Sequence, residues 1–133
     1  MESGTLRTIL IVDDNEVTLQ TYAKTLELEG YAVRMAADAA TAWRELEQGR
    51  PDALILDLRL PEAADGLQFL RDLRTRDGTT PVAVVTGDYG LDDHVVDEIR
   101  ARHARLVFKP LWVEALVELT AELIRSGPPP TAF

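Results

Sequence analysis

Residues 8–14, Thr-Ile-Leu-Ile-Val-Asp-Asp, carry the pattern that decides the fold. The apolar, largely β-branched run is typical of a strand buried on both faces, as in a parallel sheet. It leads directly into two carboxylates, Asp13 and Asp14, at the carboxyl end of the strand, where open α/β sheets bind ligands. Neighbouring carboxylates repel each other, so a buried pair needs a cation. The alternative, which residues 8–14 alone leave open, is a solvated acidic turn.

The composition is that of a single globular domain. The 133 residues are 46% hydrophobic and 28% charged, enough to bury a core. Asp and Glu total 23 against 14 Lys and Arg, and the net charge of −9 disfavours nucleic acid and membrane as direct partners. The absence of cysteine excludes disulfides and thiol chemistry. With no apolar run of ~18 residues and no signal-like N-terminus, we expect a cytoplasmic location.

The rest of the chain alternates between strand and helix patterns. Further strands are predicted over residues 31–36, 53–57, 82–85 and 105–109. Apolar residues at helical spacing predict five helices, over residues 15–29, 39–48, 67–76, 91–103 and 111–125. This alternation predicts an α/β fold, a doubly wound parallel sheet of five strands in the order 2-1-3-4-5 with helices on both faces. We expect one domain over residues 1–126 and a disordered Pro-rich tail over residues 127–133.

Four of the five strands end on a side chain that can do chemistry. Because the carboxyl ends of parallel strands share one edge of a sheet, these side chains should converge. Three carboxylates there would bind a hard divalent cation, and Mg²⁺ is the expected ion. A lysine and a hydroxyl opposite would stabilise phosphoryl oxygens, and one carboxylate could attack phosphorus. The side chains in question are Asp13, Asp14, Asp57, Thr86 and Lys109.

With these residues in place, the chain resembles the receiver domain of two-component response regulators, which is CheY-like and has a flavodoxin-like fold. Any one matching motif is weak, but all of them occur in order over residues 8–125. They are Ile-Val-Asp-Asp at 11–14, Leu-Asp-Leu-Arg-Leu-Pro at 56–61, Asp-Gly at 65–66, Val-Thr-Gly at 85–87 and Phe-Lys-Pro at 108–110.

The resemblance implies that Asp57 is the phosphoacceptor, receiving a phosphoryl group from a phosphohistidine. It implies that Asp14 and Asp57 ligate Mg²⁺ together with the backbone carbonyl of Arg59. Asp13 would contact the metal mainly through water. The chain is thus expected to be a signalling phosphoprotein rather than an enzyme, promoting only its own phosphorylation and dephosphorylation.

The resemblance also assigns roles on the opposite side of the site. Thr86 would bond one phosphoryl oxygen, and Lys109 would pair with another. The Lys109–Pro110 peptide bond is expected to be cis, which would hold the lysine inward.

The sequence departs from the family pattern in two places. Many receivers carry a switch aromatic three residues before the lysine, where this chain has Leu106. The loop after Asp57 is one residue longer than usual, with residues 62–64 standing before the Asp-Gly pair. Side chains at the positions of Arg59 and Asp88 tune loss of the phosphoryl group in the family. We hypothesise that this pair approaches across the mouth of the site and hinders the attacking water.

The expected partners are a histidine kinase or a histidine phosphotransfer protein and a downstream protein target. The chain contains no DNA-reading helix-turn-helix, so we expect it to signal through a changed binding surface or to relay phosphoryl groups. It is also similar to receivers attached to hybrid histidine kinases. Met1 suggests a natural start, but excision from a longer protein is an alternative.

Three other interpretations compete with this one. A pseudo-receiver, acting as an interaction module without phosphorylation, would lack part of the Asp57–Lys109 set. A phosphohydrolase of the haloacid dehalogenase type needs an aspartate where this chain has Arg59. A nucleotide site would need a Gly-rich loop after the first strand, which is missing. His94 and the acidic residues near it, including Glu98, are interpreted as the solvated face of the fourth helix.

Overall fold

A computed structural model describes residues 6–60 and 65–126. The predicted tail over 127–133 and residues 62–64 of the lengthened loop lie outside the described residues. Those described alternate strictly between strand and helix, as the sequence predicts. The elements are β1 (Thr8–Val12), α1 (Glu16–Leu28), β2 (Ala32–Ala36), α2 (Ala39–Gln48), β3 (Ala53–Asp57), α3 (Gly66–Arg76), β4 (Val82–Thr86), α4 (Asp93–Ala101), β5 (Ala104–Phe108) and α5 (Val113–Ser126).

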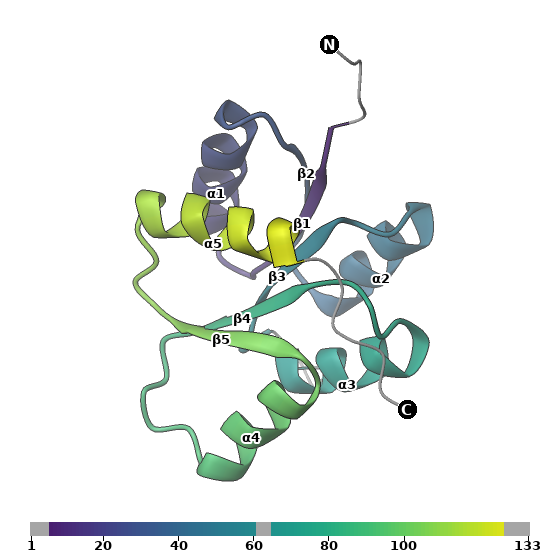
Figure 1. Ribbon diagram of the computed structural model, residues 1–133, viewed down its shortest axis with the longest axis vertical. Helices are drawn as coiled ribbons and strands as arrows, with labels where there is room; N and C mark the ends of the chain where they lie inside the picture. Colours follow the sequence, from purple (N-terminus) through teal and green to yellow (C-terminus); the bar gives the residue numbers. More distant parts are fainter. Residues whose placement is uncertain (1–5, 61–64, 127–133) are drawn as a thin grey trace.

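The five strands form one parallel sheet in the order β2-β1-β3-β4-β5. The predicted flavodoxin-like order is therefore confirmed, and Figure 1 shows the sheet between two layers of helices. The register aligns the carboxyl ends of the strands, with Asp57 opposite Val85 and Thr86 opposite Phe108. The sheet thereby brings the chemically active strand ends to one edge.

Alternate residues of each strand feed two separate cores, one on each face of the sheet. Ile11, Ile55 and Val85 pack with α1 and α5. Leu10, Leu56 and the other residues of opposite parity pack with α2, α3 and α4. Both faces of β3 and β4 are buried, which explains why these strands are apolar runs rather than alternating patterns.

Aspartate and asparagine side chains fix where the first three helices begin. The Asn15 carboxamide oxygen accepts from the backbone N–H of Thr18 at 2.9 Å, and Asp38 accepts from Thr41 at 2.7 Å. Asp65 caps α3 in the same way. Such caps satisfy N–H groups that have no partner inside the helix.

Two predictions about helix ends are wrong. The fourth helix, predicted over residues 91–103, spans Asp93–Ala101, because Asp92 is extended and His103 has a left-handed φ of 59°. Trp112, which falls within the fifth helix predicted over residues 111–125, precedes α5 and is 69% exposed. Trp112 fits the apolar spacing of the helix, but that spacing does not show that α5 begins one residue later, at Val113.

Glu98 is also placed differently from the prediction of a solvated helix face. Its carboxylate accepts from Arg71 of α3 at 2.6 Å and from Arg102 at 2.9 Å. Arg74, also on α3, donates to the carbonyl oxygen of Arg102 at 2.7 Å. The carboxyl end of α4 is therefore tied to α3 by charged hydrogen bonds.

Among residues 6–60 and 65–126, no helix combines the length and the apolarity needed to cross a membrane.

Candidate functional site

Strand parity decides which side chains share the site. Asp13, Asp57 and Lys109 each lie two residues beyond an apolar residue that packs towards α1 and α5. Because side chains alternate along a strand, the three leave the sheet edge on that same side. Thr86 has the opposite parity and leaves on the side of α4.

Three carboxylates form the acidic part of the site. Asp13, Asp14 and Asp57 each offer an oxygen within 4.8 Å of the others, among the described residues. Asp13 and Asp57 are buried, whereas Asp14 is exposed. Backbone groups orient the buried pair, since Asn15 N–H donates to Asp13 at 2.9 Å and Arg59 N–H donates to Asp57 at 3.0 Å. This cluster of hard oxygen donors fits a divalent cation such as Mg²⁺.

Lys109 supplies the positive charge opposite the buried carboxylates. Its Nζ lies 3.4 Å from an oxygen of Asp13 and 3.4 Å from an oxygen of Asp57. The Lys109 backbone N–H donates to the carbonyl of Thr86 at 2.8 Å, and the Lys109–Pro110 bond is cis. The amine of the last strand is therefore held inside the site by residues from three other segments.

Burial and charge shift the acid–base properties of this group. Loss of water around the Asp57 carboxylate, reinforced by the charge of Asp13, raises its pKa above 3.8 despite hydrogen bonds from Arg59 and Lys109. Burial alone would lower the pKa of Lys109, but the charges of Asp13 and Asp57 outweigh it and raise that pKa. Lys109 is therefore a fixed cation, and Asp57 is a carboxylate that gains from a further positive charge.

These side chains open into a pocket of about 560 Å³, which we call the strand-end pocket. Its mouth is crossed by Arg59 and Asp88, whose side chains approach to 3.9 Å in a solvent-exposed pair. The predicted approach of these two side chains is therefore present. The lining residues are Asp13, Asp14, Asn15, Thr18, Asp57, Arg59, Gly87, Asp88, Tyr89 and Lys109.

Two candidate residues lie outside this lining. Thr86 is 1% exposed, and its Oγ1 accepts from the backbone N–H of Asp88 at 3.0 Å, behind the pocket wall. Leu106 lies opposite Val84 and packs on the core beneath α4. Among the described residues, the structure therefore brings together the carboxylates, the lysine and the tuning pair, but neither the threonine nor Leu106.

Three lining residues were missed by the sequence predictions. Asn15 and Thr18 enter through the start of α1, and the sequence predicted only that a helix begins near residue 15. Tyr89 also lines the pocket, and its hydroxyl donates to the carbonyl of Lys109. The sequence feature that could have identified Tyr89 as a pocket residue is its position three residues after Thr86, in the loop that follows β4.

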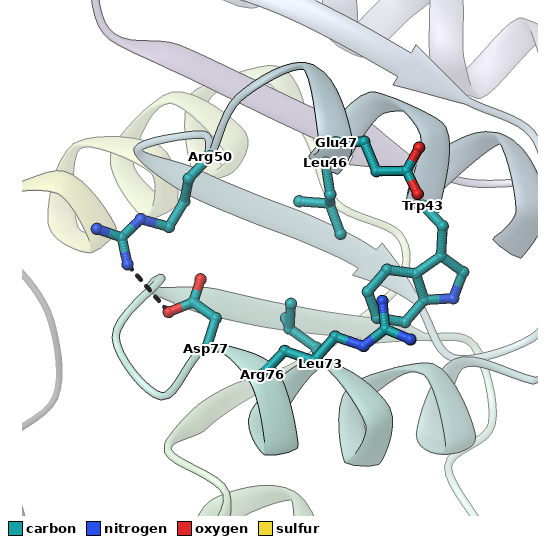
Figure 2. Close-up of a pocket in the computed structure, with 7 residues that line it drawn as sticks. All are labelled: Trp43, Leu46, Glu47, Arg50, Leu73, Arg76 and Asp77. Atoms are coloured by element: carbon teal, nitrogen blue, oxygen red, sulfur yellow. Dashed lines mark hydrogen bonds and ion pairs between the residues drawn. The ribbon is translucent and has the colours of Figure 1, made fainter.

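A second pocket, of about 320 Å³, lies between α2 and α3, and it contains none of the strand-end residues (Figure 2). Arg50 pairs with Asp77 at 3.1 Å along one side. The Arg76 guanidinium lies 4.3 Å from the ring centre of Trp43, which in turn packs on Phe69. Arg50, Arg76 and Asp77 are engaged in these contacts, and none of the three clustered carboxylates lines this pocket, so the chemistry belongs to the strand-end pocket.

Comparisons with known proteins agree with this geometry. The response regulator receiver domain family matches residues 9–121. The transcriptional regulatory protein PrrA of Mycobacterium tuberculosis is 33% identical over 126 residues, which are 94% of this chain and 53% of PrrA. The response regulator MprA of Mycobacterium avium is 31% identical over 121 residues. The chain spans about half the length of these curated relatives.

Solved structures are similar over nearly the whole chain. A CheY-like receiver domain protein from Methanospirillum hungatei superimposes with a TM-score of 0.81 at 27% identity, covering 92% of this chain and 96% of that one. The chemotaxis response regulator CheY4 of Vibrio cholerae has a TM-score of 0.79 at 27% identity, covering 90% of this chain and 99% of that one.

Proposed function

This chain belongs to the response regulator receiver domain family, and on that premise we propose that Asp57 accepts a phosphoryl group from a phosphohistidine of a partner protein. The observation that carries the proposal is the placement of Lys109 Nζ, 3.4 Å from both Asp13 and Asp57. The lysine faces the two buried carboxylates in a pocket open to solvent. This arrangement combines an anionic nucleophile with a cation for the incoming phosphoryl oxygens.

Mg²⁺ is the proposed cofactor, and the three clustered carboxylates fit it. Asp14, Asp57 and the backbone carbonyl of Arg59 would hold the ion directly, with Asp13 acting mainly through water. When bound, the ion supplies positive charge that offsets carboxylate repulsion and draws in the phosphoryl oxygens. Because the pKa of Asp57 is raised by burial, added positive charge favours the ionised nucleophile.

In the proposed step, an Asp57 carboxylate oxygen attacks phosphorus and forms a P–O bond. The bond between phosphorus and the histidine nitrogen breaks, and its electron pair returns to the donor imidazole. Lys109 pairs with a phosphoryl oxygen, and the Thr86 hydroxyl bonds another after moving from its present position. Hydrolysis by water later returns Asp57 to a carboxylate and releases inorganic phosphate.

As a member of a signalling family, the chain interacts with kinases or downstream effectors. We propose a histidine kinase or histidine phosphotransfer protein as donor, and a downstream protein that binds the altered surface. Action in the cytoplasm, without direct contact with nucleic acid or membrane, is part of this proposal, and the net charge of −9 supports the latter. Attachment to a hybrid histidine kinase stays a prediction.

The alternative function is that of a pseudo-receiver, an interaction module that works without phosphorylation. Such a chain would be expected to lack one of the groups needed for transfer. Here Asp57 and Lys109 are both present and 3.4 Å apart, which favours the phosphoacceptor. A phosphohydrolase is disfavoured because Arg59 stands where the second aspartate would act as acid and base.

The test is incubation with acetyl phosphate and Mg²⁺, followed by measurement of the intact mass. We expect a gain of one phosphoryl group, which should not occur when a chelator is present from the start of the incubation or in Asp57→Asn. Asp97→Asn, a change of an exposed aspartate of α4, is the matched control and should gain the group normally. A wild-type chain that gains no mass under these conditions would support the pseudo-receiver instead.

A further inference from the structure

The pocket between α2 and α3, which we call the α2–α3 pocket, is lined at its centre by apolar side chains. Leu46 and Leu73 form opposite walls, and the indole of Trp43 forms one end (Figure 2). Trp43 and Leu46 pack against the core but are only partly buried. A pocket of about 320 Å³ between partly exposed apolar side chains is a place where a further apolar group would bind favourably.

The charges around the α2–α3 pocket cancel, so it favours an uncharged occupant. Among the described residues, two arginines and two acidic residues line it. Arg50 pairs with Asp77 at 3.1 Å, and the Arg76 guanidinium lies 4.3 Å from the ring centre of Trp43. A charged ligand would give up its hydration for a pocket without net charge, which costs free energy. The occupant that fits best is therefore apolar and neutral.

Residues 127–133, Gly-Pro-Pro-Pro-Thr-Ala-Phe, have that chemistry. They contain no ionisable side chain, although the chain as a whole carries a net charge of −9. Three consecutive prolines favour the extended polyproline II conformation, which is preformed and so loses little entropy on binding. Proline-rich segments are recognised by grooves lined with aromatic side chains, and Trp43 supplies one here.

The tail begins close to a surface that leads to the α2–α3 pocket. α5 ends at Ser126, and Ile124 in its last turn lines a smaller pocket of about 160 Å³. Pro51 and Pro81 line the same small pocket and precede β3 and β4, so it lies at the amino edge of the sheet. Arg50 lines both pockets and therefore connects the end of α5 with the α2–α3 pocket.

The tail is also long enough to reach the pocket. Residues 127–133 in the polyproline II conformation would span about 22 Å, at about 3.1 Å per residue. α5 packs on one face of the sheet, and α2 and α3 pack on the other. Packed layers lie about 10 Å apart, so helices on opposite faces are separated by about 20 Å. Tethering gives the tail a local concentration of the order of millimolar, so a weak contact is enough to hold it in place.

We propose that residues 127–133 bind in the α2–α3 pocket of the same chain, with the prolines against Trp43 and the segment passing the amino edge of the sheet beside Arg50. This contact ties the last helix of the chain to two helices on the opposite face. It lies at the edge of the sheet opposite Asp57 and Lys109, so it does not depend on the proposed function.

Acrylamide quenching of tryptophan fluorescence tests the proposal, because one of the two tryptophans lines the pocket. Trp112→Phe leaves Trp43 as the fluorophore, and Trp43→Phe leaves the exposed Trp112 as the matched control. Into each 133-residue chain the changes Pro128→Ser, Pro129→Ser and Pro130→Ser are introduced together. The quenching constant of Trp43 should then rise about twofold, because tethering keeps the pocket largely occupied before the change. The constant of Trp112 should stay the same, and an unchanged constant for Trp43 overturns the proposal.

A second readout uses the wild-type chain, and it stands even if a variant fails to fold. NMR should show nuclear Overhauser contacts between the indole protons of Trp43 and the proline rings at 128–130. In a mixture of isotope-labelled and unlabelled chains, these contacts should arise only within one chain. Their absence overturns the proposal, and so do contacts between chains alone, which would make the occupant the tail of a second copy. Neither measurement needs a phosphoryl donor, so their failure leaves the proposed role of Asp57 to its own test.

Discussion

Arg59 and Asp88 both line the strand-end pocket, which on the proposed function water must enter to reach a phosphorylated Asp57. Their side-chain atoms approach to 3.9 Å, and Arg59 is 81% exposed, so the ion pair adds little stability. We predict that Arg59→Ala speeds loss of the phosphoryl group by about threefold, a barrier change of about 0.6 kcal/mol. The half-life of the phosphorylated protein, followed by intact mass in the wild type and in Arg59→Ala, tests this prediction.

Arg44→Ala is the matched control for that change. Arg44 is an α2 arginine whose side chain bonds Thr41, away from the strand-end pocket. The free energy of unfolding of both variants should lie within about 0.5 kcal/mol of the wild-type value. Equal half-lives for the wild type and Arg59→Ala would show that the pair does not obstruct water.

The positions of individual site residues were predictable from the sequence where the residue lies at the end of a predicted strand. Asp13, Asp57 and Lys109 follow apolar runs directly, and the parallel sheet brings them together. Tyr89 was not predictable in the same way, because its contact with Phe108 depends on the path of an irregular loop. No periodicity describes such a loop, so its side chains are located only by tertiary structure.

At the scale of elements, the turn from β3 into α3 depends on Gly66. A Cβ at this position would meet the backbone of Asp57 and lie 2.7 Å from the Cα of Leu58. The Gly66 N–H also donates to the carbonyl of Leu58 at 2.8 Å. The helix therefore begins in direct contact with the backbone that carries Asp57, the proposed phosphoacceptor.

We predict that Gly66→Ala lowers the free energy of unfolding by about 2 kcal/mol, because the added methyl group must push that backbone aside. Affinity for Mg²⁺ should fall in the same variant. Gly78→Ala is the control, since a Cβ there meets no atom within 4 Å and its expected effect is under about 0.5 kcal/mol. Urea unfolding measures the free energy of unfolding of each variant, and a Mg²⁺ titration measures its affinity for the ion. Similar losses in the two variants would contradict this account of the turn.

Element identity was more predictable than element ends or charged contacts between helices. The spacing of Val95 and Ile99 predicts α4 correctly, whereas its ends depend on the backbone at Asp92 and His103. The pairing of Glu98 with Arg71 joins residues on two helices, 27 positions apart. A helical pattern shows that Glu98 is polar, but not that a neighbouring helix supplies its partners.

For the whole molecule, paired carboxylates set the stability in acid. Hydrogen bonds from Arg71 and then Arg102 lower the pKa of Glu98 from 4.5 to about 2. A carboxyl whose pKa is lower in the folded state stabilises the fold above its unfolded pKa and stops doing so as pH falls towards the folded value. Asp57, whose pKa burial raises, has the opposite sign and opposes folding at neutral pH.

We predict that Glu98→Gln lowers the free energy of unfolding by about 1 kcal/mol at pH 7, a small value because solvent screens the partly exposed Arg71. The difference from wild type should shrink between pH 4.5 and about 2, where Glu98 of the wild type becomes protonated. Urea unfolding at several pH values measures this dependence. The change Glu118→Gln, on the exposed surface of α5, is the control and should change the free energy of unfolding by less than about 0.5 kcal/mol at pH 7. A difference for Glu98→Gln that is constant with pH would contradict the prediction.

Lys109 meets Asp13 across 96 positions of sequence, because the last strand supplies the amine and the first supplies the acid. During synthesis on the ribosome, the acidic half of the centre emerges long before its counter-charge. A polypeptide cut short before β5 would carry Asp57 without Lys109. If Asp57 is the phosphoacceptor, as proposed, such fragments should gain no phosphoryl group from a donor.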